Sequence, residues 1–403
     1  MPKRIAIVSS SCPPVSTGGV SSAQYNLCRA LKRKGFNVQM FTFGDYGVVS
    51  DEPGITRVGL TPRIGNIIEI LCKLYFRIVD PFRLAYSFVE VVYFALPCLK
   101  LSRLINRFQP DVLILSDHGC PGLFITKPDK CRTIWISHHN PARFLNNPLW
   151  GLYSEHDSRL TIACENKALK KVDAVVCPSH HMYQMFKKTY EYSGPVTVIP
   201  NIVDTELIAS IPAHDIRADL GLLDDSILIY IPSAGSVHKG ARFVFEIVRR
   251  LAAYCVKDIG FYLSGSINPS LEYELRAVPP NARIYAPGHV SYHDNLAIVK
   301  ACSFGISPTL VENFGMAILE ANCCGVPMVS FDVGGNEDVV SNGRSGFLVP
   351  YLDVEALVGA ACRLMEDKYR VAMRREAAQY AADTFNSNLV IERFISVMDL
   401  SRP

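Results

Sequence analysis

Residues 303–350 decide the fold, and they read SFGISPTLVENFGMAILEANCCGVPMVSFDVGGNEDVVSNGRSGFLVP. The segments with regular patterns are a strand at 304–307, a helix at 316–321 and a strand at 328–331. Pro308 ends the first strand, and Gly315 stands at the start of the helix. Gly325 is expected to end the helix, because glycine suits a left-handed cap and the proline two positions later cannot continue the turn. The pattern predicts a strand–loop–helix–strand unit of a parallel sheet, and therefore the α/β fold class.

Two glutamates are placed around the start of this predicted helix. Glu312 lies in the loop before it, and Glu320 lies inside it, roughly 7 to 8 Å further along the helix axis. The free backbone N–H groups at a helix start favour a phosphate. A ligand with a diphosphate in its middle would fit between them, with sugar hydroxyls at Glu312 and a ribose at Glu320. The spacing therefore predicts a nucleotide-sugar site.

The same stretch resembles the signature of the retaining glycosyltransferases of family four, including those of bacterial polysaccharide and lipopolysaccharide synthesis. The segments that carry the resemblance are, in order, Ser307-Pro308, Glu312-Asn313-Phe314-Gly315, Glu320-Ala321, Gly325-Val326-Pro327, Gly334-Gly335, Asn342-Gly343 and Gly346. A pair of glutamates alone would be a weak signal, whereas the ordered string is specific. The resemblance covers essentially the whole chain and is strongest in this stretch.

The resemblance implies the GT-B fold, in which two Rossmann-like domains face a cleft. We expect an N-terminal acceptor-binding domain at 1–210 and a nucleotide-sugar-binding domain at 211–384. The C-terminal helix, within 385–403, is expected to cross back onto the N-terminal domain. The run VIPNIVDTEL at 198–207 matches the segment that closes the first domain in this family.

Composition is consistent with a globular protein of two domains. The chain has 403 residues, of which 49% are hydrophobic and 20% charged, with a net charge of +3, which is enough length for two cores and gives no case for nucleic-acid binding. Thirteen cysteines occur without a CxxC pair, so we expect reduced thiols. No signal sequence and no membrane-spanning run are evident. We therefore expect a cytoplasmic protein, with peripheral contact to the inner membrane face as an option.

Near the N-terminus, an apolar strand at 5–8 is followed by a loop and by a helix at 20–34. Gly18 and Gly19 lie directly before this helix. Glycines here allow the backbone to come close to a phosphate or a sugar, and they also suit a simple turn. The resemblance implies the first role, because the family has a Gly-Gly loop at this place that faces the donor.

Residues 64–108 are dense in large apolar and aromatic side chains, with lysines and arginines spaced through them. Two interpretations stay open. The segment is either a pair of buried helices packed on the first domain or an amphipathic surface helix that docks on anionic lipid. The second interpretation would suit an enzyme with a lipid-linked acceptor.

Histidines follow the apolar strand at 133–137. Open parallel sheets bind ligands at the carboxyl ends of their strands, so His138 and His139 are candidates for a site. The resemblance implies a histidine near the transferred sugar; His139 is the better match and His138 the fallback. No third ligand is evident for a metal. A polar helix is expected at 165–174.

Lys239 stands beside a glycine, between a strand at 227–232 and a helix at 243–254. Such a lysine suits phosphate binding as a point charge. The sequence departs here from the family pattern, which usually has Gly-Arg where this chain has Ser233-Ala234. Backbone donors of the loop, or Arg242, would have to neutralise the diphosphate in place of that arginine.

The resemblance implies transfer of a sugar, with retention, from a UDP- or GDP-sugar to a hydroxyl of a glycan or lipid-linked acceptor, in surface polysaccharide synthesis. The residues expected to act in catalysis are His139, Lys239 and Glu312. Those expected to bind the nucleotide-sugar are Gly18, Gly19, Lys239, Asn313, Phe314, Gly315, Met316 and Glu320. No DxD pair ends a strand, so we expect no metal and no cofactor. The alternatives are a nucleotide-sugar 2-epimerase and a degenerate nucleotide-sugar-binding subunit.

Overall fold

The computed structural model describes residues 3–13, 18–44, 53–145, 149 and 151–398. It divides the chain into two compact units. The first unit contains the described residues up to Ile202 together with those from Ser387 on, and the second runs from Val203 to Asn386. The chain therefore passes from one unit to the other twice.

The first unit is built on a seven-stranded sheet in the order β3-β2-β1-β4-β5-β6-β7, with every neighbouring pair parallel. Its strands are β1 Arg4–Ser9, β2 Asn37–Thr42, β3 Ile55–Arg57, β4 Val112–Ser116, β5 Arg132–Ile136, β6 Ala174–Cys177 and β7 Val196–Val198. The central strands are apolar along their length because helices cover both faces of a parallel sheet. The carboxyl ends of all these strands meet at one edge, where ligands bind in such folds.

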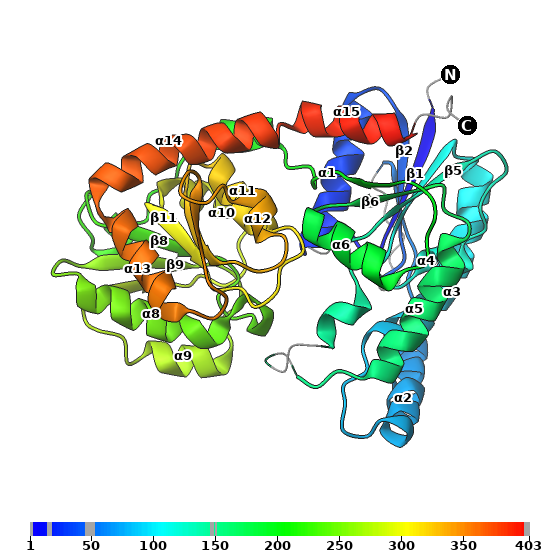
Figure 1. Cartoon of the computed structure of the whole chain (residues 1–403), viewed down its shortest axis with the longest axis horizontal. Coiled ribbons are helices and arrows are strands. Elements are labelled where there is room, and N and C mark those ends of the chain that lie inside the picture. The colour runs from blue at the N-terminus through cyan, green and yellow to red at the C-terminus, as the bar shows by residue number, and fades with distance from the viewer. Residues whose placement is uncertain (1–2, 14–17, 45–52, 146–148, 150, 399–403) are drawn as a thin grey trace. The chain divides into compact units, whose positions relative to one another are not determined.

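The helices of the first unit connect and cover these strands (Figure 1). They are α1 Gly19–Arg33, α2 Pro62–Val79, α3 Ser87–Phe108, α4 Pro121–Phe124, the 3₁₀ turn η1 Pro141–Phe144, α5 Glu155–Leu169, α6 His180–Thr189 and α15 Ser387–Met398. The prediction of a polar helix at 165–174 is wrong in its bounds, because α5 runs from Glu155 to Leu169. The helix begins at Glu155, because the Ser154 side chain caps it by accepting the Asp157 N–H, and Ala174 already opens β6.

Residues 64–108 form two helices, α2 and α3, and the interpretation that both are buried holds for α3 alone. Helix α3 has a buried row that packs on the sheet, as expected. The interpretation as a pair of buried helices is wrong for α2, because Gly65 and Phe76 alone are buried among its residues. Its exposed apolar side chains are Ile64, Ile67, Ile70, Leu71, Leu74, Tyr75, Ile78 and Val79.

The second unit is a six-stranded parallel sheet in the order β10-β9-β8-β11-β12-β13. Its strands are β8 Leu228–Ile231, β9 Ile259–Leu263, β10 Ala282–Tyr285, β11 Phe304–Ser307, β12 Met328–Phe331 and β13 Gly346–Val349. Its helices are α7 Thr205–Ser210, η3 Ala218–Leu220, η4 Val237–Lys239, α8 Ala241–Tyr254, α9 Pro269–Leu275, α10 Tyr292–Ala301, α11 Met316–Cys323, α12 Asn336–Val339, α13 Val354–Met365 and α14 Asp367–Thr384.

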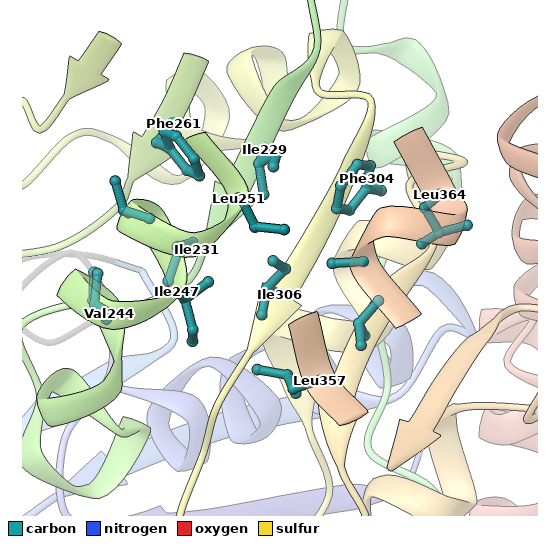
Figure 2. Close-up of a cluster of buried hydrophobic side chains, with 14 of the residues drawn as sticks. Ile229, Ile231, Val244, Ile247, Leu251, Phe261, Phe304, Ile306, Leu357 and Leu364 are labelled. Carbon is teal, nitrogen blue, oxygen red and sulfur yellow. The ribbon is translucent and has the colours of Figure 1, made fainter. Parts of the chain in front are cut away.

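One core cluster of the second unit lies between its sheet and helices α8 and α13 (Figure 2). Ile229, Phe304 and Ile306 project from the central strands β8 and β11, and Ile247 and Leu357 reach them from the two helices. All five side chains are fully buried. This packing fixes the strands whose carboxyl ends carry the loops described below.

The predicted strand–loop–helix–strand unit is confirmed as β11, α11 and β12. Gly315 has a φ of +62° at the start of α11, and Gly325 has a φ of +69° just past its end. Both values lie in the left-handed region that favours glycine. The expected α/β class is therefore observed in each unit.

Candidate active site

An ion pair joins two loops of the second unit at the carboxyl edge of its sheet. The Lys239 Nζ lies 2.5 Å from Glu312 Oε2. The Glu312 side chain is 15% exposed and the Lys239 side chain 34%. Burial alone would raise the pKa of the Glu312 carboxyl, but the adjacent ammonium reverses this and holds the pKa below its usual value. Glu312 is therefore a carboxylate at neutral pH, with a cation on one oxygen.

The lysine loop is held against the glutamate loop by its backbone. The Leu310 N–H donates to the His238 carbonyl at 2.9 Å. Gly240 has a φ of +82°, and a Cβ there would lie 1.9 Å from the Pro308 carbonyl oxygen. Only glycine permits this approach. The Lys-Gly pair noted in the sequence thus has a structural reason for its glycine beyond any ligand.

The glutamate loop is fixed on its other side in the same manner. The Gly335 N–H donates to the Glu312 carbonyl at 2.9 Å. A Cβ on Gly334 would lie 1.8 Å from that carbonyl oxygen, and the φ of Gly334 is +59°. The position of Glu312 is therefore set by two glycine-dependent contacts rather than by its own rotamer.

The start of α11 is partly used by the protein itself. The Glu312 carboxylate accepts from the Asn313 N–H at 3.2 Å and from the Gly315 N–H. Two of the backbone donors that the sequence predicts for a phosphate are thus paired with Glu312. The Phe314 side chain is buried and its ring lies 6.0 Å from that of Phe385, so only its main chain is available to a ligand. Met316 is the first residue of the helix.

Glu320 lies one helical repeat further on and has a tyrosine partner that the sequence did not reveal. The Tyr292 hydroxyl, from the start of α10, donates to Glu320 Oε1 at 3.1 Å. Burial raises the pKa of Glu320 to about 7, and the hydrogen bond from Tyr292 opposes that shift. Position 292 directly follows the cap Ser291, but nothing in the sequence pairs it with a residue 28 positions away.

The loop that departs from the family pattern has an unusual backbone. Ser233 has a φ of +49°, which is uncommon for a residue other than glycine. Its N–H donates to the Ser264 Oγ at 3.2 Å, and the Ala234 N–H donates to the Ser264 carbonyl at 3.0 Å. These two backbone donors are engaged inside the protein. The Arg242 guanidinium lies over the ring of Phe243 at 5.7 Å.

In the first unit, the two histidines after β5 have different surroundings. His138 Nε2 is hydrogen-bonded to Asn201 Oδ1 at 2.8 Å, and burial lowers the pKa of His138 to about 4. The His139 N–H donates to Asp117 Oδ2 at 2.5 Å. His139 is 6% exposed, and its Nε2 has no hydrogen-bond partner within the described residues. The two rings therefore differ at Nε2, which is bonded to Asn201 in His138 and has no partner among the described residues in His139.

A histidine–glutamate pair, His118 with Glu90, lies beside His139 and was missed by sequence reasoning. His118 Nε2 is 3.0 Å from Glu90 Oε2, and the His118 ring lies 5.4 Å from the His139 ring. Although burial opposes it, the Glu90 carboxylate raises the pKa of His118. Burial also raises the pKa of Asp117 to about 7. The signal available was the polar run Ser116-Asp117-His118 at the end of β4.

The remaining candidates lie at the start of α1. Gly19 is its first residue and Gly18 its N-cap, with a φ of −64° that any residue adopts. The preceding residues 14–17 lie outside the described part of the chain. The structure thus brings together Lys239, Glu312 and the start of α11 in the second unit, whereas His139, Gly18 and Gly19 belong to the first.

Metal-ligating side chains do not cluster in the part of the chain that the structure describes: it contains no group of three or more His, Cys, Asp or Glu that could hold an ion. The absence of a metal requirement stays a prediction. None of the thirteen cysteines, all of which lie in the described ranges, forms a disulfide, in line with their irregular spacing.

Family comparisons agree with the two-unit architecture. Residues 17–207 match the sequence model "Glycosyltransferase Family 4", and residues 225–367 match "Glycosyl transferases group 1". Together these matches span most of the chain and include the candidate residues of both units.

Curated relatives are glycosyltransferases that match in part. An Escherichia coli protein named UDP-Gal:alpha-D-GlcNAc-diphosphoundecaprenol alpha-1,3-galactosyltransferase is 26% identical over 220 residues, covering 53% of this chain and 56% of its own. A D-inositol 3-phosphate glycosyltransferase of Stackebrandtia nassauensis is 27% identical over 52% of this chain and 49% of its own. The chain thus spans about half the length of the curated relatives it matches.

Solved structures match over nearly the whole chain. The sucrose-phosphate synthase of Thermosynechococcus elongatus has a TM-score of 0.74 at 18% identity and 98% coverage of both chains. The HepE protein of Anabaena, solved in complex with UDP-glucose, has a TM-score of 0.69 at 15% identity, covering 98% of this chain and 99% of its own. At such identities the likeness shows the fold, which is the GT-B arrangement of two Rossmann-like domains. With the ordered motif around Glu312 and the two family matches, the chain belongs to the family-four glycosyltransferases.

Proposed function

We propose that this chain is a retaining glycosyltransferase that moves a sugar from a nucleoside-diphosphate sugar to a hydroxyl of a glycan or lipid-linked acceptor in surface polysaccharide synthesis. One observation carries the proposal: the Lys239–Glu312 ion pair stands at the start of α11, the helix that carries Glu320. A cation for phosphate, a carboxylate for sugar hydroxyls and a second carboxylate for ribose are thus fixed on one rigid unit. The names of the relatives, which include UDP-Gal as a donor, support a UDP-sugar.

The reaction breaks the bond between the anomeric carbon and the diphosphate oxygen, and the electron pair stays on that oxygen. The acceptor oxygen bonds to the same carbon, and its proton passes to the departing diphosphate. The residue best placed to stabilise the charge that grows on the leaving group is Lys239, with the N–H groups of α11 that Glu312 does not occupy. Because Glu312 is already ion-paired, its role is to hold sugar hydroxyls rather than to attack the sugar.

His139 is proposed to contact the transferred sugar from the first unit. Its lowered pKa, caused first by burial and then by Arg143 and His118, keeps the ring neutral at physiological pH. A neutral Nε2 without a protein partner in the described part of the chain is able to accept from a sugar hydroxyl or donate to one, depending on its tautomer. We propose no metal and no cofactor; addition of a chelator is expected to leave turnover unchanged.

The proposal is tested first by ligand binding. A thermal-shift panel of UDP, GDP, ADP and their sugar conjugates is expected to raise the melting temperature with one nucleotide family, because a ligand that binds the native state alone stabilises it. Glu312→Gln is expected to lower kcat/KM by about 10²-fold. The matched control is Glu337→Gln, an exposed first-turn residue of α12, which is expected to leave turnover unchanged.

A degenerate nucleotide-sugar-binding subunit is the second candidate, and one observation favours it. The N–H groups of Ser233 and Ala234 are used internally, so the arginine usual at this loop has no evident replacement there. Binding of a nucleotide-sugar without loss of donor, with or without acceptor, would select this candidate. Loss of donor only in the presence of an acceptor would exclude it.

We also propose peripheral contact of helix α2 with an anionic membrane. No helix in the described ranges combines the length and apolarity needed to cross a bilayer. Ile67, Ile70, Leu74 and Ile78 are each more than half exposed and recur every three or four residues, so they share one face of the helix. The helix also carries basic residues, as helices at a lipid interface do: Arg63, Lys73 and Arg77, with Arg83 in the turn that follows.

The membrane contact is tested by co-sedimentation with vesicles that contain phosphatidylglycerol. The double variant Ile70→Ser with Leu74→Ser is expected to lose most vesicle binding and to keep its melting temperature. Leu389→Ser, which alters an exposed apolar residue of α15, is the control and is expected to bind as the parent does. Equal binding of all three proteins would exclude α2 as the docking element.

A further inference from the structure

A pocket of about 480 Å³ lies in the first unit between α2, α3 and the turn that joins them. Its walls include Phe76 and Arg77 from α2, Arg83 from the turn, Tyr86 at the N-cap of α3, and Glu90 and Phe94 from α3. Its size is in the range of pockets that enclose most of a small organic ligand. It contains none of the residues assigned above to the nucleotide-sugar.

The pocket borders the exposed apolar face of α2. Glu69, Lys73 and Arg77 line it and are spaced by four residues, so they form one row along the helix. The next row around the helix is apolar and exposed, and it includes Ile70 and Leu74. The row of Glu69, Lys73 and Arg77 thus adjoins the pocket on one side and the exposed apolar face on the other.

The pocket has two guanidinium groups, those of Arg77 and Arg83, that no carboxylate of its lining neutralises. Each of its carboxylates has a partner: Glu69 pairs with Lys73 at 2.6 Å, Glu90 with His118 at 3.0 Å, and Asp80 accepts from the Ser154 hydroxyl at 2.6 Å. Among the described residues, no carboxylate pairs with Arg77 or with Arg83, whose Nη1 donates only to the Tyr153 carbonyl at 3.3 Å. Guanidinium groups match the oxygens of a phosphate in two-pronged geometry.

One wall of the pocket is shared with the histidine cluster. Tyr86, Glu90 and Phe94, again spaced by four, line the pocket. On their other side, the ring of Tyr86 lies 6.1 Å from that of His139, Glu90 pairs with His118, and the ring of Phe94 lies 6.3 Å from that of His118. A ligand in the pocket is thus one side chain away from the histidine proposed to meet the sugar.

We propose that this pocket binds the phosphate or diphosphate of a lipid-linked acceptor together with the adjoining hydrocarbon chain. Arg77 and Arg83 hold the phosphate oxygens, and Phe76, Tyr86 and Phe94 pack on the chain. The inference rests on the proposed function, which supplies the acceptor hydroxyl, and it adds the chemical class of the acceptor: a hydroxyl-bearing group joined through phosphate to a lipid.

The test is direct binding of farnesyl diphosphate, below its micellar concentration, to the full chain by isothermal titration calorimetry. Saturable binding is expected. Farnesol and inorganic diphosphate are each expected to bind far more weakly, because farnesol lacks the diphosphate and inorganic diphosphate lacks the hydrocarbon chain. Arg77→Ala and Arg83→Ala are each expected to weaken binding about tenfold. Ala85→Trp, which fills the pocket without changing its charge, is expected to abolish binding.

The matched control is Arg103→Ala, because Arg103 is an exposed arginine of α3 outside the pocket. It is expected to bind within about twofold of the parent, since it makes no contact with the ligand. Equal weakening by Arg103→Ala would overturn the proposal, since attraction by bulk charge would then explain the binding. Indifference to the Arg77, Arg83 and Ala85 variants would overturn it as well, and so would tighter binding of dihexanoylphosphatidylglycerol, which stands for bulk membrane lipid.

The failure of this inference is distinguishable from the failure of the proposed function. A protein that is stabilised by a nucleotide-sugar and consumes it with a glycan acceptor, but does not bind farnesyl diphosphate, keeps the proposed function and loses the lipid pocket. A protein that binds neither ligand loses both. Circular dichroism melting curves of each variant show whether a loss of binding reflects unfolding.

Discussion

The two candidate binding regions are built by different means. In the second unit, the position of Glu312 is set by backbone approaches that only glycine allows, at Gly240 and Gly334. In the first unit, the pocket beside the histidines is formed by packed side chains. Two of them, Tyr86 and Glu90, also contact the histidines. A site defined by the backbone requires particular residues at particular spacings, so it leaves a pattern in the sequence. A site defined by packed side chains leaves none.

The largest expected effect comes from breaking the backbone of the second region. Gly334→Ala places a Cβ 1.8 Å from the Glu312 carbonyl oxygen, so the glutamate loop must move. A displacement of this size at a substrate-positioning residue is expected to lower kcat/KM by about 10²-fold or more. The measurement is steady-state kinetics with saturating acceptor, together with the melting temperature.

Gly343→Ala provides the matched control for that variant. Gly343 also has a positive φ, +79°, but a Cβ added there would meet no atom within 4 Å. Its substitution is expected to cost about 1 kcal/mol of stability through backbone strain and to leave kcat/KM unchanged. If both variants lose activity equally, strain rather than the Glu312 contact would explain the loss, and the contrast between the two regions would weaken.

The next effect is a pH dependence of nucleotide binding. Burial raises the pKa of Glu320 to about 7, and a ribose hydroxyl donates best to the ionised carboxylate. Affinity is therefore expected to fall about tenfold between about pH 8 and about pH 6, in proportion to the ionised fraction. Titration calorimetry across this range measures it, and Glu320→Gln is expected to bind weakly with a flat profile. A parent profile as flat as that of the variant would remove Glu320 from the ribose site.

The same shift has a defined sign for stability. The folded state retains the Glu320 proton up to about pH 7, whereas the unfolded chain releases it near the usual value of 4.5. The contribution of Glu320 to the free energy of unfolding is therefore fully present below about pH 4.5 and is lost as the pH rises through about 7. Glu320→Gln is expected to remove this part of the pH dependence.

A smaller effect tests the side-chain region. Glu90→Gln removes the carboxylate that raises the pKa of His118, so burial dominates and the pKa is expected to fall below its ordinary value. Proton NMR titration of the His118 ring measures it. Glu69→Gln is the matched control, because Glu69 also lines the pocket but pairs with Lys73. An unchanged His118 titration in Glu90→Gln would contradict the pairing.

The smallest effect concerns a serine that adopts a glycine-like backbone in the loop before Lys239. Ser233→Gly relieves a φ of +49° and is expected to stabilise the protein by up to about 1 kcal/mol, after the entropy that glycine adds to the unfolded chain. Ser236→Gly, in the same loop with a φ of −81°, is expected to destabilise it by about 0.5–1 kcal/mol. Urea denaturation measures both; effects of the same sign would show that φ does not decide them.

The sequence was sufficient for those parts of the second region that are local. Pro308, Gly315 and Gly325 bound a strand and a helix within a short stretch, and the structure confirms all three boundaries. Lys239 was found through its glycine neighbour. Tyr292 was not, because its bond to Glu320 depends on how α10 packs against α11.

In the first region, the sequence located His139 through the end of a strand but not the Glu90–His118 pair, which joins the first turn of α3 to the residues that follow β4, the next strand. The sequence also could not decide whether the apolar face of α2 is buried or exposed. An amphipathic pattern has the same period whether its apolar face meets protein or solvent. The start of α5 could have been found, since Ser154 and the acidic residues Glu155 and Asp157 form an N-terminal capping signal.

The last helix has a consequence for how the protein is made. Val390, Ile391 and Phe394 of α15 complete a core that begins with residues of β1 and α1, and Glu392 pairs with Lys34 at 2.7 Å. During synthesis the first unit is therefore left with an open apolar seam until the whole second unit and then α15 have been translated. The unit that starts first finishes last, and a chain whose synthesis ends within the second sheet has no helix to cover the seam.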